Sequence, residues 1–351
     1  MPARLRCAVI GTGAAGLEHL RSLASCHHAA VVAIAEIDPK RSKEAVDLLK
    51  IHRSYTDYRE LLEQPDIDAV TIALPNHLHA RVAVEALQAR KHVFLETPMA
   101  THAKAAAKIF ETAKKMRCVL MVGQGFRFNR HTQAAKEILD RGLIGEVYHA
   151  RCFFLRRSAI PRLGSWSTQK EFAAGGCVCD LGVQMLDAGL HLLGDFDVKS
   201  VSGQVYSKLG PRASGNGERG KSAVNSAPVF DVEDYGAALV KLRTGRTVIL
   251  EASWAAFHAP SSREYGVDLF GTTGGLSLYP ARLFREGAQG YEVIELAPQK
   301  LAHSEDALHH FVSCVVQGKK PLIPLEESLK VQQIIDAIYA SAASGKEFFL
   351  K

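Results

Sequence analysis

The first third of the chain alternates short apolar runs with longer segments that mix polar and apolar residues at helical spacing. Runs such as 7–10 and 31–35 are continuously apolar, as strands buried on both faces of a sheet are. This alternation predicts a doubly wound parallel sheet. The predicted strands are 5–10, 31–35, 69–74, 92–95 and 118–122, and the predicted helices are 17–24, 42–49, 58–63, 81–89 and 104–116.

The pattern changes beyond residue 125. Apolar runs now follow one another with short connections, which favours an antiparallel sheet with a few helices. We therefore expect two domains, 1–125 and 126–351, and a mobile loop at 208–228, where Gly, Ser, Lys and Arg dominate. The predicted strands are 145–154, 198–206, 235–242, 247–254, 266–270, 275–278, 283–286 and 291–296, and the predicted helices are 131–142, 176–193 and 325–344.

Composition narrows the classes of partner. The 351 residues are 47% apolar and 23% charged, as in soluble globular proteins. The formal charge of +6 comes from scattered basic residues, which argues against a nucleic-acid partner. We expect no membrane span, because no apolar run is long enough. The seven cysteines lack metal-ligand spacing, so we expect free thiols, a reducing cytoplasm and no metal site.

Candidate chemistry begins at Gly11-Thr12-Gly13-Ala14-Ala15-Gly16, between the first strand and the first helix. In this context G-x-G-x-x-G is the dinucleotide fingerprint, whose glycines permit a tight turn, the approach of a pyrophosphate and close helix packing. Glu36 ends the second strand at the expected spacing. A carboxylate there accepts ribose hydroxyls and repels a 2′-phosphate, so NAD is favoured over NADP, although Lys40 and Arg41 could soften the preference.

Ligands of a parallel sheet bind beyond the carboxyl ends of its strands. That rule selects the stretches 74–79, 96–98 and 123–127. The resulting candidates for the cofactor site are Leu74, Pro75, Asn76, His79, Glu96 and Gln124, with Thr97 at the same edge. For His79 a structural role is favoured over proton transfer. Arg127 could pair with a substrate carboxylate or phosphate, or form a structural salt bridge.

One predicted helix in the second half has a narrow polar stripe. At 100° per residue, Asp180, Gln184, Asp187 and His191 fall within one arc between apolar residues. Such a stripe must meet polar partners or a ligand, because unpaired burial costs about 1–3 kcal/mol per group. Helix capping is the alternative for Asp180, and a structural role is expected for His191.

An irregular segment leads into the second domain and carries two further candidates. Arg156 and Trp166 lie there, and we expect them to contact the substrate. Core packing is the alternative for Trp166.

Together these features resemble the Gfo/Idh/MocA family of NAD(P)-dependent oxidoreductases. The resemblance implies a Rossmann domain, then an α/β domain with an open, mostly antiparallel sheet whose outer face forms a homodimer or homotetramer interface. It also implies hydride exchange between nicotinamide and a hydroxyl-bearing carbon of a sugar, cyclitol or related polyol. The motifs are GTGAAG at 11–16, LPNHLH at 74–79, HVFLETP at 92–98, GQGFRF at 123–128, GGCVCDLGVQMLD at 175–187 and DALHHFVSCVVQGKKPLIP at 306–324.

Two residues depart from the family pattern. Members usually have Lys where this chain has Thr97 and His where it has Gln184. Lys and His polarise the reacting hydroxyl and move its proton, a contribution typically worth about 10²–10⁴-fold in rate. Asp180 is retained and is the candidate base, while Thr97 and Gln184 can orient a substrate oxygen.

Three functions remain open on these residues. The first is an NAD-dependent sugar or polyol oxidoreductase with a relocated acid–base group. The second is an enzyme that uses NAD without net redox change, for glycoside cleavage, elimination or epimerisation. The third is a catalytically silent protein that binds NAD or a sugar.

Overall fold

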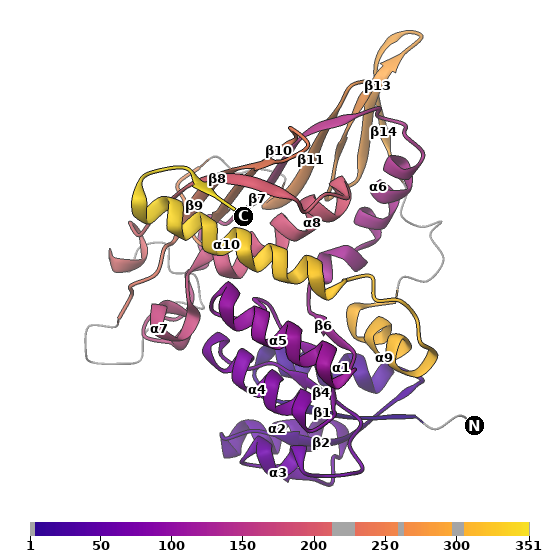
Figure 1. The fold of residues 1–351 in the computed structure, drawn as a ribbon, viewed down its shortest axis with the longest axis vertical. Helices are drawn as coiled ribbons and strands as arrows, with labels where there is room; N and C mark the ends of the chain where they lie inside the picture. Colours follow the sequence, from indigo (N-terminus) through magenta and orange to yellow (C-terminus); the bar gives the residue numbers. More distant parts are fainter. Residues whose placement is uncertain (1–3, 213–228, 259–262, 297–304, 351) are drawn as a thin grey trace. The chain divides into compact units, whose positions relative to one another are not determined.

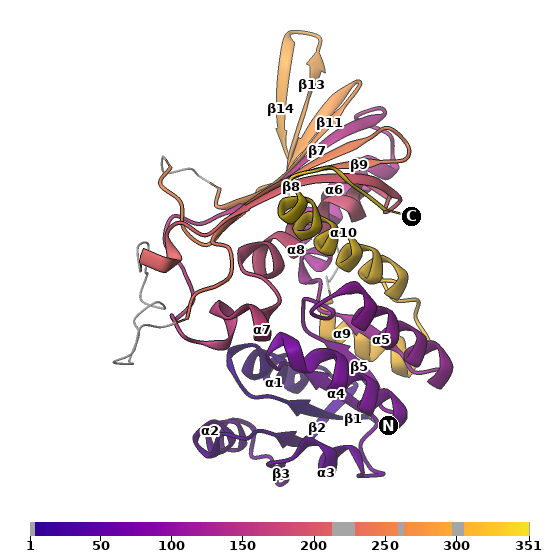
Figure 2. The same cartoon turned by 60° about the vertical axis from the view of Figure 1, so that its left-hand side comes forward.

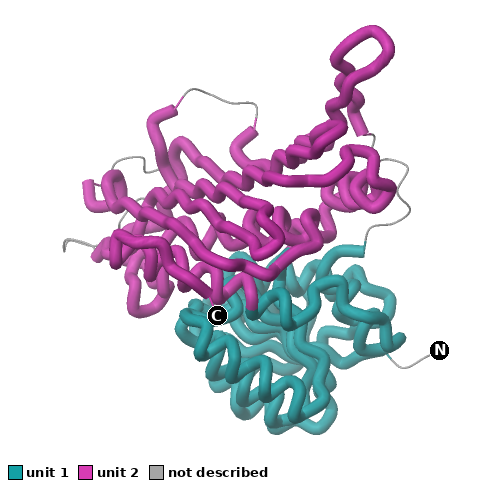
Figure 3. Tube along the Cα trace, turned by 45° about the horizontal axis from the view of Figure 1, so that its top comes forward, with its two compact units in different colours: residues 1–124, 305–329 teal, residues 125–304, 330–351 magenta. Residues whose placement is uncertain are grey.

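The computed structural model describes residues 4–212, 229–258, 263–296 and 305–350. Most of the predicted loop 208–228 lies outside these residues. The chain forms two compact units (Figure 3): unit 1 comprises residues 1–124 and 305–329, and unit 2 comprises residues 125–304 and 330–351. Each unit has its own sheet and its own hydrophobic core.

Unit 1 is built on a six-stranded parallel sheet in the order β3-β2-β1-β4-β5-β6 (Figure 1). The central strands are buried on both faces, and this explains their continuous apolar sequence. The predicted doubly wound sheet is confirmed. The strands are β1 (Leu5–Ile10), β2 (Ala29–Ala35), β3 (Ser54–Tyr55), β4 (Ala69–Ile72), β5 (His92–Leu95) and β6 (Leu120–Val122).

The helices of unit 1 begin at recognisable residues. Asp38 accepts hydrogen bonds from the main-chain N–H groups of Lys40 and Arg41 at the start of α2, and Asp57 caps α3 in the same way. The helices are α1 (Ala14–Ser25), α2 (Pro39–Leu49), α3 (Tyr58–Leu62), α4 (Asn76–Gln88), α5 (Ala103–Met116) and α9 (Ala307–Gln317).

Unit 2 is built on a nine-stranded sheet in the order β14-β13-β12-β11-β7-β10-β9-β8-β15. Among the described strand pairs of this sheet, only β7–β10 is parallel, so the predicted, mostly antiparallel sheet is confirmed. The strands are β7 (Val147–Leu155), β8 (Val198–Tyr206), β9 (Tyr235–Leu242), β10 (Thr247–Ser253), β11 (Tyr265–Gly271), β12 (Gly274–Ser277), β13 (Arg282–Gly287), β14 (Gly290–Glu295) and β15 (Phe348–Phe349).

Helices cover one face of this sheet, as Figure 2 shows for α8 and α10. Val248 and Leu250 of β10 point into the core on that side, and Ile249 between them is 37% exposed on the other face. The helical elements are η1 (Gly125–Phe128), α6 (Arg130–Asp140), η2 (Trp166–Thr168), α7 (Lys170–Ala173), η3 (Val178–Gly182), α8 (Val183–Leu193), η4 (Gly210–Arg212) and α10 (Leu325–Ser344).

Several features differ from the sequence expectation. The helix expected at 176–193 begins with η3, a π-helical turn, before α8. Helix α9 and strand β15 were not expected. Residues 305–329, placed in the expected domain 126–351, belong to unit 1 because Phe311 of α9 meets Phe94 of β5 with their ring centroids 5.9 Å apart, and Leu325 packs on the same core.

The described residues bear on the expectations about cysteines, metal sites and membrane spans. All seven cysteines are free, and six are buried. Within the described residues no cluster of three His, Cys, Asp or Glu side chains is arranged to hold a metal ion. No described helix has both the length and the apolar character needed to span a bilayer.

Candidate active site

The glycine turn after β1 has the geometry of a phosphate-binding loop. Gly11 has φ +87°, and a Cβ there would collide with the carbonyl of Ala73. A Cβ on Gly16 would collide with the carbonyl of Gly11. At Gly13 the nearest atom to a Cβ, Nη1 of Arg41, is 4.0 Å away. The first and third glycines are therefore required by packing, whereas the second leaves open space.

Helix α1 begins directly after Gly13, and the side chains of Ala14 and Ala15 in its first turn are exposed. The main-chain N–H groups of a first helical turn have no partner within the helix, and the helix dipole adds partial positive charge. An anionic pyrophosphate fits this place. The residues present therefore fit a dinucleotide cofactor.

Glu36, at the end of β2, lies against the glycine turn. Its Oε2 accepts the main-chain N–H of Thr12 at 2.8 Å and the Thr12 hydroxyl at 3.0 Å. Its Oε1 accepts the main-chain N–H of Asp38 at 3.0 Å and lies 3.4 Å from the guanidinium of Arg41. The fingerprint spacing thus brings this carboxylate beside the turn.

His79 is 1% exposed and lies between two main-chain carbonyls. Its Nε2 is 2.8 Å from the oxygen of Leu74 and its Nδ1 is 2.8 Å from the oxygen of Pro98. Burial lowers the pKa of His79. The ring therefore joins the segments that follow β4 and β5, which fits the structural role expected for it, and its contact with the cofactor stays a prediction. Asn76 is buried at the start of α4, which follows Pro75.

Glu96, at the end of β5, is held by a residue that the sequence analysis missed. His19 of α1 is 4% exposed, and its Nε2 lies 2.7 Å from Oε1 of Glu96. The main-chain N–H of Thr97 donates to Oε2 at 3.2 Å. Burial by itself would raise the pKa of Glu96, but these hydrogen bonds and the charge of His19 outweigh burial and hold the pKa below its ordinary value. The signal for His19 was a polar residue on the buried face of α1, one turn after Gly16.

Gln124, after β6, is 2% exposed, and its Oε1 accepts the hydroxyl of Ser328 at 3.0 Å. This bond ties the end of β6 to the first turns of α10 within unit 1. Gln124 is therefore a buried link within unit 1, and its contact with the cofactor stays a prediction.

Arg127 is fully buried and forms a two-point ion pair with Asp187, with N···O distances of 2.8 and 2.6 Å. The guanidinium also lies over the ring of Phe196. The structural alternative therefore holds, and Arg127 is not proposed as a substrate contact. His191 is nearby, and burial together with the charges of Arg127 and Lys136 lowers its pKa to about 3. It is a neutral structural side chain at physiological pH.

Asp180 is an exposed residue on η3 whose Oδ2 accepts the indole Nε1–H of Trp254 at 2.7 Å. Gln184, in the first turn of α8, is half-buried. The four-residue polar stripe expected on one helix is thus divided. The π-helical turn changes the angular spacing between Asp180 and Asp187, and Asp187 is fully buried.

A buried carboxylate holds the turn that carries Asp180. Oε1 of Glu233 accepts the main-chain N–H groups of Gly176 at 2.8 Å and Val178 at 3.0 Å, and the hydroxyl of Tyr339 at 2.8 Å. Glu233 is 5% exposed, and burial raises its pKa. Neither Glu233 nor Trp254 carried a sequence signal, because each acts through a tertiary contact.

Arg156 follows β7 and is hydrogen-bonded to the last residue of β10. Its main-chain N–H donates to the carbonyl of Ser253, the residue before Trp254, and its guanidinium lies over the ring of Phe154. Trp166 is 40% exposed on η2. Unit 2 thus places Arg156 and Asp180 at the same end of β10.

Two family models match the chain. The model described as "Oxidoreductase family, NAD-binding Rossmann fold" matches residues 5–124, and the "GFO/IDH/MocA C-terminal domain" matches residues 132–277. The first region includes the candidate residues up to Gln124, and the second includes Arg156, Trp166, Asp180 and Gln184.

Named relatives extend these matches. The chain is 28% identical over 345 residues to D-glucoside 3-dehydrogenase of Escherichia coli K12, covering 97% of this chain and 96% of the relative. It is 31% identical over 256 residues to a putative UDP-kanosamine synthase oxidoreductase subunit of Amycolatopsis mediterranei, covering 73% of this chain and 70% of the relative. A structure of levoglucosan dehydrogenase in complex with NADH and levoglucosan shares the fold, with a TM-score of 0.85, 24% identity and 99% coverage of both chains.

Proposed function

The chain belongs to the GFO/IDH/MocA oxidoreductase family, and we propose that it oxidises a hydroxyl-bearing carbon of a sugar, glycoside or related polyol with NAD. The observation that carries the proposal is the glycine turn, which leaves space at Gly13, whereas Gly11 and Gly16 are closely packed. The names of the relatives, among them a glucoside dehydrogenase, support the substrate class.

NAD is the proposed cofactor because of Glu36. Its carboxylate lies beside the turn and would accept ribose hydroxyls, whereas it would repel a 2′-phosphate. Arg41, 3.4 Å away, offsets part of that repulsion. When bound, NAD supplies the acceptor for the hydride of the substrate carbon.

Asp180 is the proposed base. Thr97 and Gln184 carry no group that exchanges a proton near neutral pH, so they are proposed to orient the substrate oxygen. Asp180 is exposed and held in place, which suits a group that receives the hydroxyl proton. Arg156 and Trp166 are proposed to contact the sugar, and Leu74, Pro75 and Asn76 the cofactor.

Turnover of NAD tests the function directly. The wild type is mixed with NAD and a panel of methyl glucosides, levoglucosan and myo-inositol, and NADH is followed by absorbance while products are separated by chromatography. We expect NADH with at least one glycoside or polyol. Asp180→Asn should lose about 10²–10⁴-fold of the rate, and Asp197→Asn, an exposed acid of the same unit, should not.

The same assay separates the two alternatives. Product without net NADH would indicate an enzyme that uses NAD transiently. Tight NAD binding without product from any substrate would indicate a silent binding protein, and a gain of NADH in a Thr97→Lys, Gln184→His double variant would then show that the sugar site is intact.

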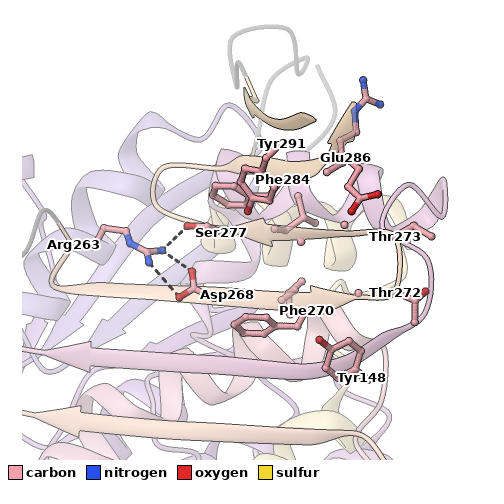
Figure 4. Close-up of a pocket in the computed structure, with 16 residues that line it drawn as sticks. Tyr148, Arg263, Asp268, Phe270, Thr272, Thr273, Ser277, Phe284, Glu286 and Tyr291 are labelled. Carbon is pink, nitrogen blue, oxygen red and sulfur yellow. Dashed lines mark hydrogen bonds and ion pairs between the residues drawn. The ribbon is translucent and has the colours of Figure 1, made fainter. Parts of the chain in front are cut away.

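We also propose that the outer face of the sheet in unit 2 joins copies of the chain as a homodimer or homotetramer. This face has a concavity of about 800 Å³. Phe270, Phe284 and Tyr291 line it beside charged residues such as Asp268 and Glu286 (Figure 4). Phe270 is 42% and Tyr291 74% exposed, and Ile249 lies on the same face. Ile249→Lys with Phe270→Lys should reduce the mass measured by light scattering to that of one chain. Val316→Lys, an exposed apolar position of unit 1, is the control.

A further inference from the structure

A buried indole holds the carboxylate proposed as the base. Trp254 is 1% exposed, and its Nε1–H donates to Oδ2 of Asp180 at 2.7 Å. We infer that Trp254 is a positioning residue that fixes the carboxylate of Asp180 in the orientation in which it receives the substrate proton. This inference rests on the proposed function.

Trp254 is itself fixed on several sides. Its main-chain N–H donates to the carbonyl of Asp234 at 3.0 Å, and its carbonyl accepts the N–H of Ala159 at 2.9 Å. The ring of Phe230 lies edge-on to the indole with centroids 6.5 Å apart. Because the ring is buried and held by both main-chain and aromatic contacts, the direction of its N–H bond is set before any substrate binds.

The main chain beneath Asp180 is equally constrained. The N–H of Asp180 donates to the carbonyl of Gly176 at 3.0 Å. Glu233 binds the N–H groups of Gly176 and Val178, and a Cβ on Gly176 would collide with the carbonyl of Glu233. The carboxylate is therefore held at its backbone by Glu233 and at its oxygen by Trp254, and this is the preorganisation that a general base requires.

Asp180 carries the proton step alone in this proposal, because Thr97 and Gln184 do not titrate near neutral pH. The hydroxyl proton of the substrate passes to the carboxylate of Asp180, and the O–H bonding pair becomes the second bond of the carbonyl. The hydride of the same carbon leaves to the bound cofactor, so one alcohol becomes one ketone or lactone. A hydrogen bond from an N–H donor favours the charged carboxylate, which keeps it able to accept the proton at lower pH.

A purely structural explanation makes a different prediction. A buried indole N–H requires an acceptor, and Asp180 would then serve only the stability of Trp254. Loss of the N–H would in that case change folding stability, and the pH dependence of catalysis would stay where it is.

The pH dependence of kcat/KM separates the two explanations. Trp254→Phe removes the N–H and keeps a buried aromatic ring, and Phe230→Leu disturbs the packing against the same ring and keeps the N–H. We expect the acid-side midpoint of kcat/KM to rise by about one pH unit in Trp254→Phe. Phe230→Leu should keep the midpoint of the wild type. An unchanged midpoint in Trp254→Phe would overturn the inference.

Other groups near this turn must be separated from Asp180 in the titration. Burial raises the pKa of the Cys177 and Cys179 thiols and of the Tyr339 hydroxyl, so these groups remain protonated. Other charged or titratable groups near the turn and Trp254, among the described residues, include Glu233, Asp234, Arg156, Tyr235, Glu251 and Asp336. Asp180→Asn distinguishes the carboxylate of Asp180 from all of them.

A fluorescence titration tests the contact even if Trp254→Phe fails to fold. The chain has two tryptophans, so Trp166→Phe leaves Trp254 as the only one. We expect its emission in the cofactor-free protein to change with pH, and Asp180→Asn in the same background to abolish the change. The inference would be overturned if the emission did not change with pH, or if it changed with pH to the same extent in Asp180→Asn. If the wild type produced no NADH, the proposed function would be wrong instead. The emission result would then test only the contact between Trp254 and Asp180.

Discussion

Gly13 offers the sharpest test of the cofactor site, because the structure separates its role in binding from any role in folding. A Cβ at this position meets its nearest neighbour at 4.0 Å, an ordinary van der Waals contact, and its φ of −65° suits alanine. Gly13→Ala should therefore leave the free energy of unfolding unchanged or raise it by about 0.4–1 kcal/mol, since alanine restricts the unfolded chain.

The same methyl group would occupy the space that a pyrophosphate needs. Forcing a close contact of this kind costs about 1–3 kcal/mol, which corresponds to NAD binding weaker by about 5- to 150-fold. Gly16→Ala is the contrasting variant, because its Cβ would collide with the carbonyl of Gly11. It should lower the free energy of unfolding by about 1–3 kcal/mol and thereby impair binding indirectly.

Two measurements are needed on each variant. Isothermal titration calorimetry gives the affinity for NAD and for ADP-ribose, and urea unfolding gives the stability. The reasoning predicts a stable Gly13→Ala that binds poorly and a Gly16→Ala that is destabilised. A stable Gly13→Ala that binds NAD as tightly as the wild type would refute the assignment of this turn to the pyrophosphate.

Three further outcomes are expected. Glu36→Gln should weaken NAD binding by about tenfold and reduce the difference between the affinities for NAD and NADP. Asp38→Asn removes a carboxylate beside the same Arg41 and should change the two affinities equally. Competitive titration measures both affinities. Asp187→Asn should lower the free energy of urea unfolding by about 3–5 kcal/mol, because it removes the buried carboxylate that pairs with Arg127. Burial raises the pKa of Glu233 above its ordinary 4.5. The free energy of unfolding of the wild type should therefore fall, relative to that of Glu233→Gln, as pH rises from about 4.5 through the folded-state pKa. Equal pH dependence of the two proteins in urea unfolding would contradict this.

The sequence predicted those parts of the fold that depend on local pattern. Glu36 was located by spacing alone, because a βαβ unit fixes the distance between the glycine turn and the end of the second strand. The two-residue strand Ser54–Tyr55 and helix α9 were not predicted from the sequence. The strand is too short to show a pattern, and the helix has the composition of an ordinary apolar segment.

The direction of side chains at the sheet edge could not be predicted. Residues after a parallel strand lie near a ligand crevice, but the rule does not say which way they point. His79, Gln124 and Arg127 satisfied the rule and are nevertheless buried against main-chain carbonyls, Ser328 and Asp187 respectively. The π-helical turn was hidden because the bonds that hold it come from Glu233, far away in the sequence.

The discontinuous chain of unit 1 has a consequence for synthesis on the ribosome. Residues 305–329 complete this unit, with Phe311 and Leu325 in its core, yet they are made after the whole segment 125–304. At about 5–20 residues per second, translation of that segment takes on the order of 10–40 s. During that time the strands of the first 124 residues emerge without their last helix. A fragment that ends at residue 124 should therefore expose part of its core and require chaperones, because this unit becomes complete only after residues 305–329 have been made.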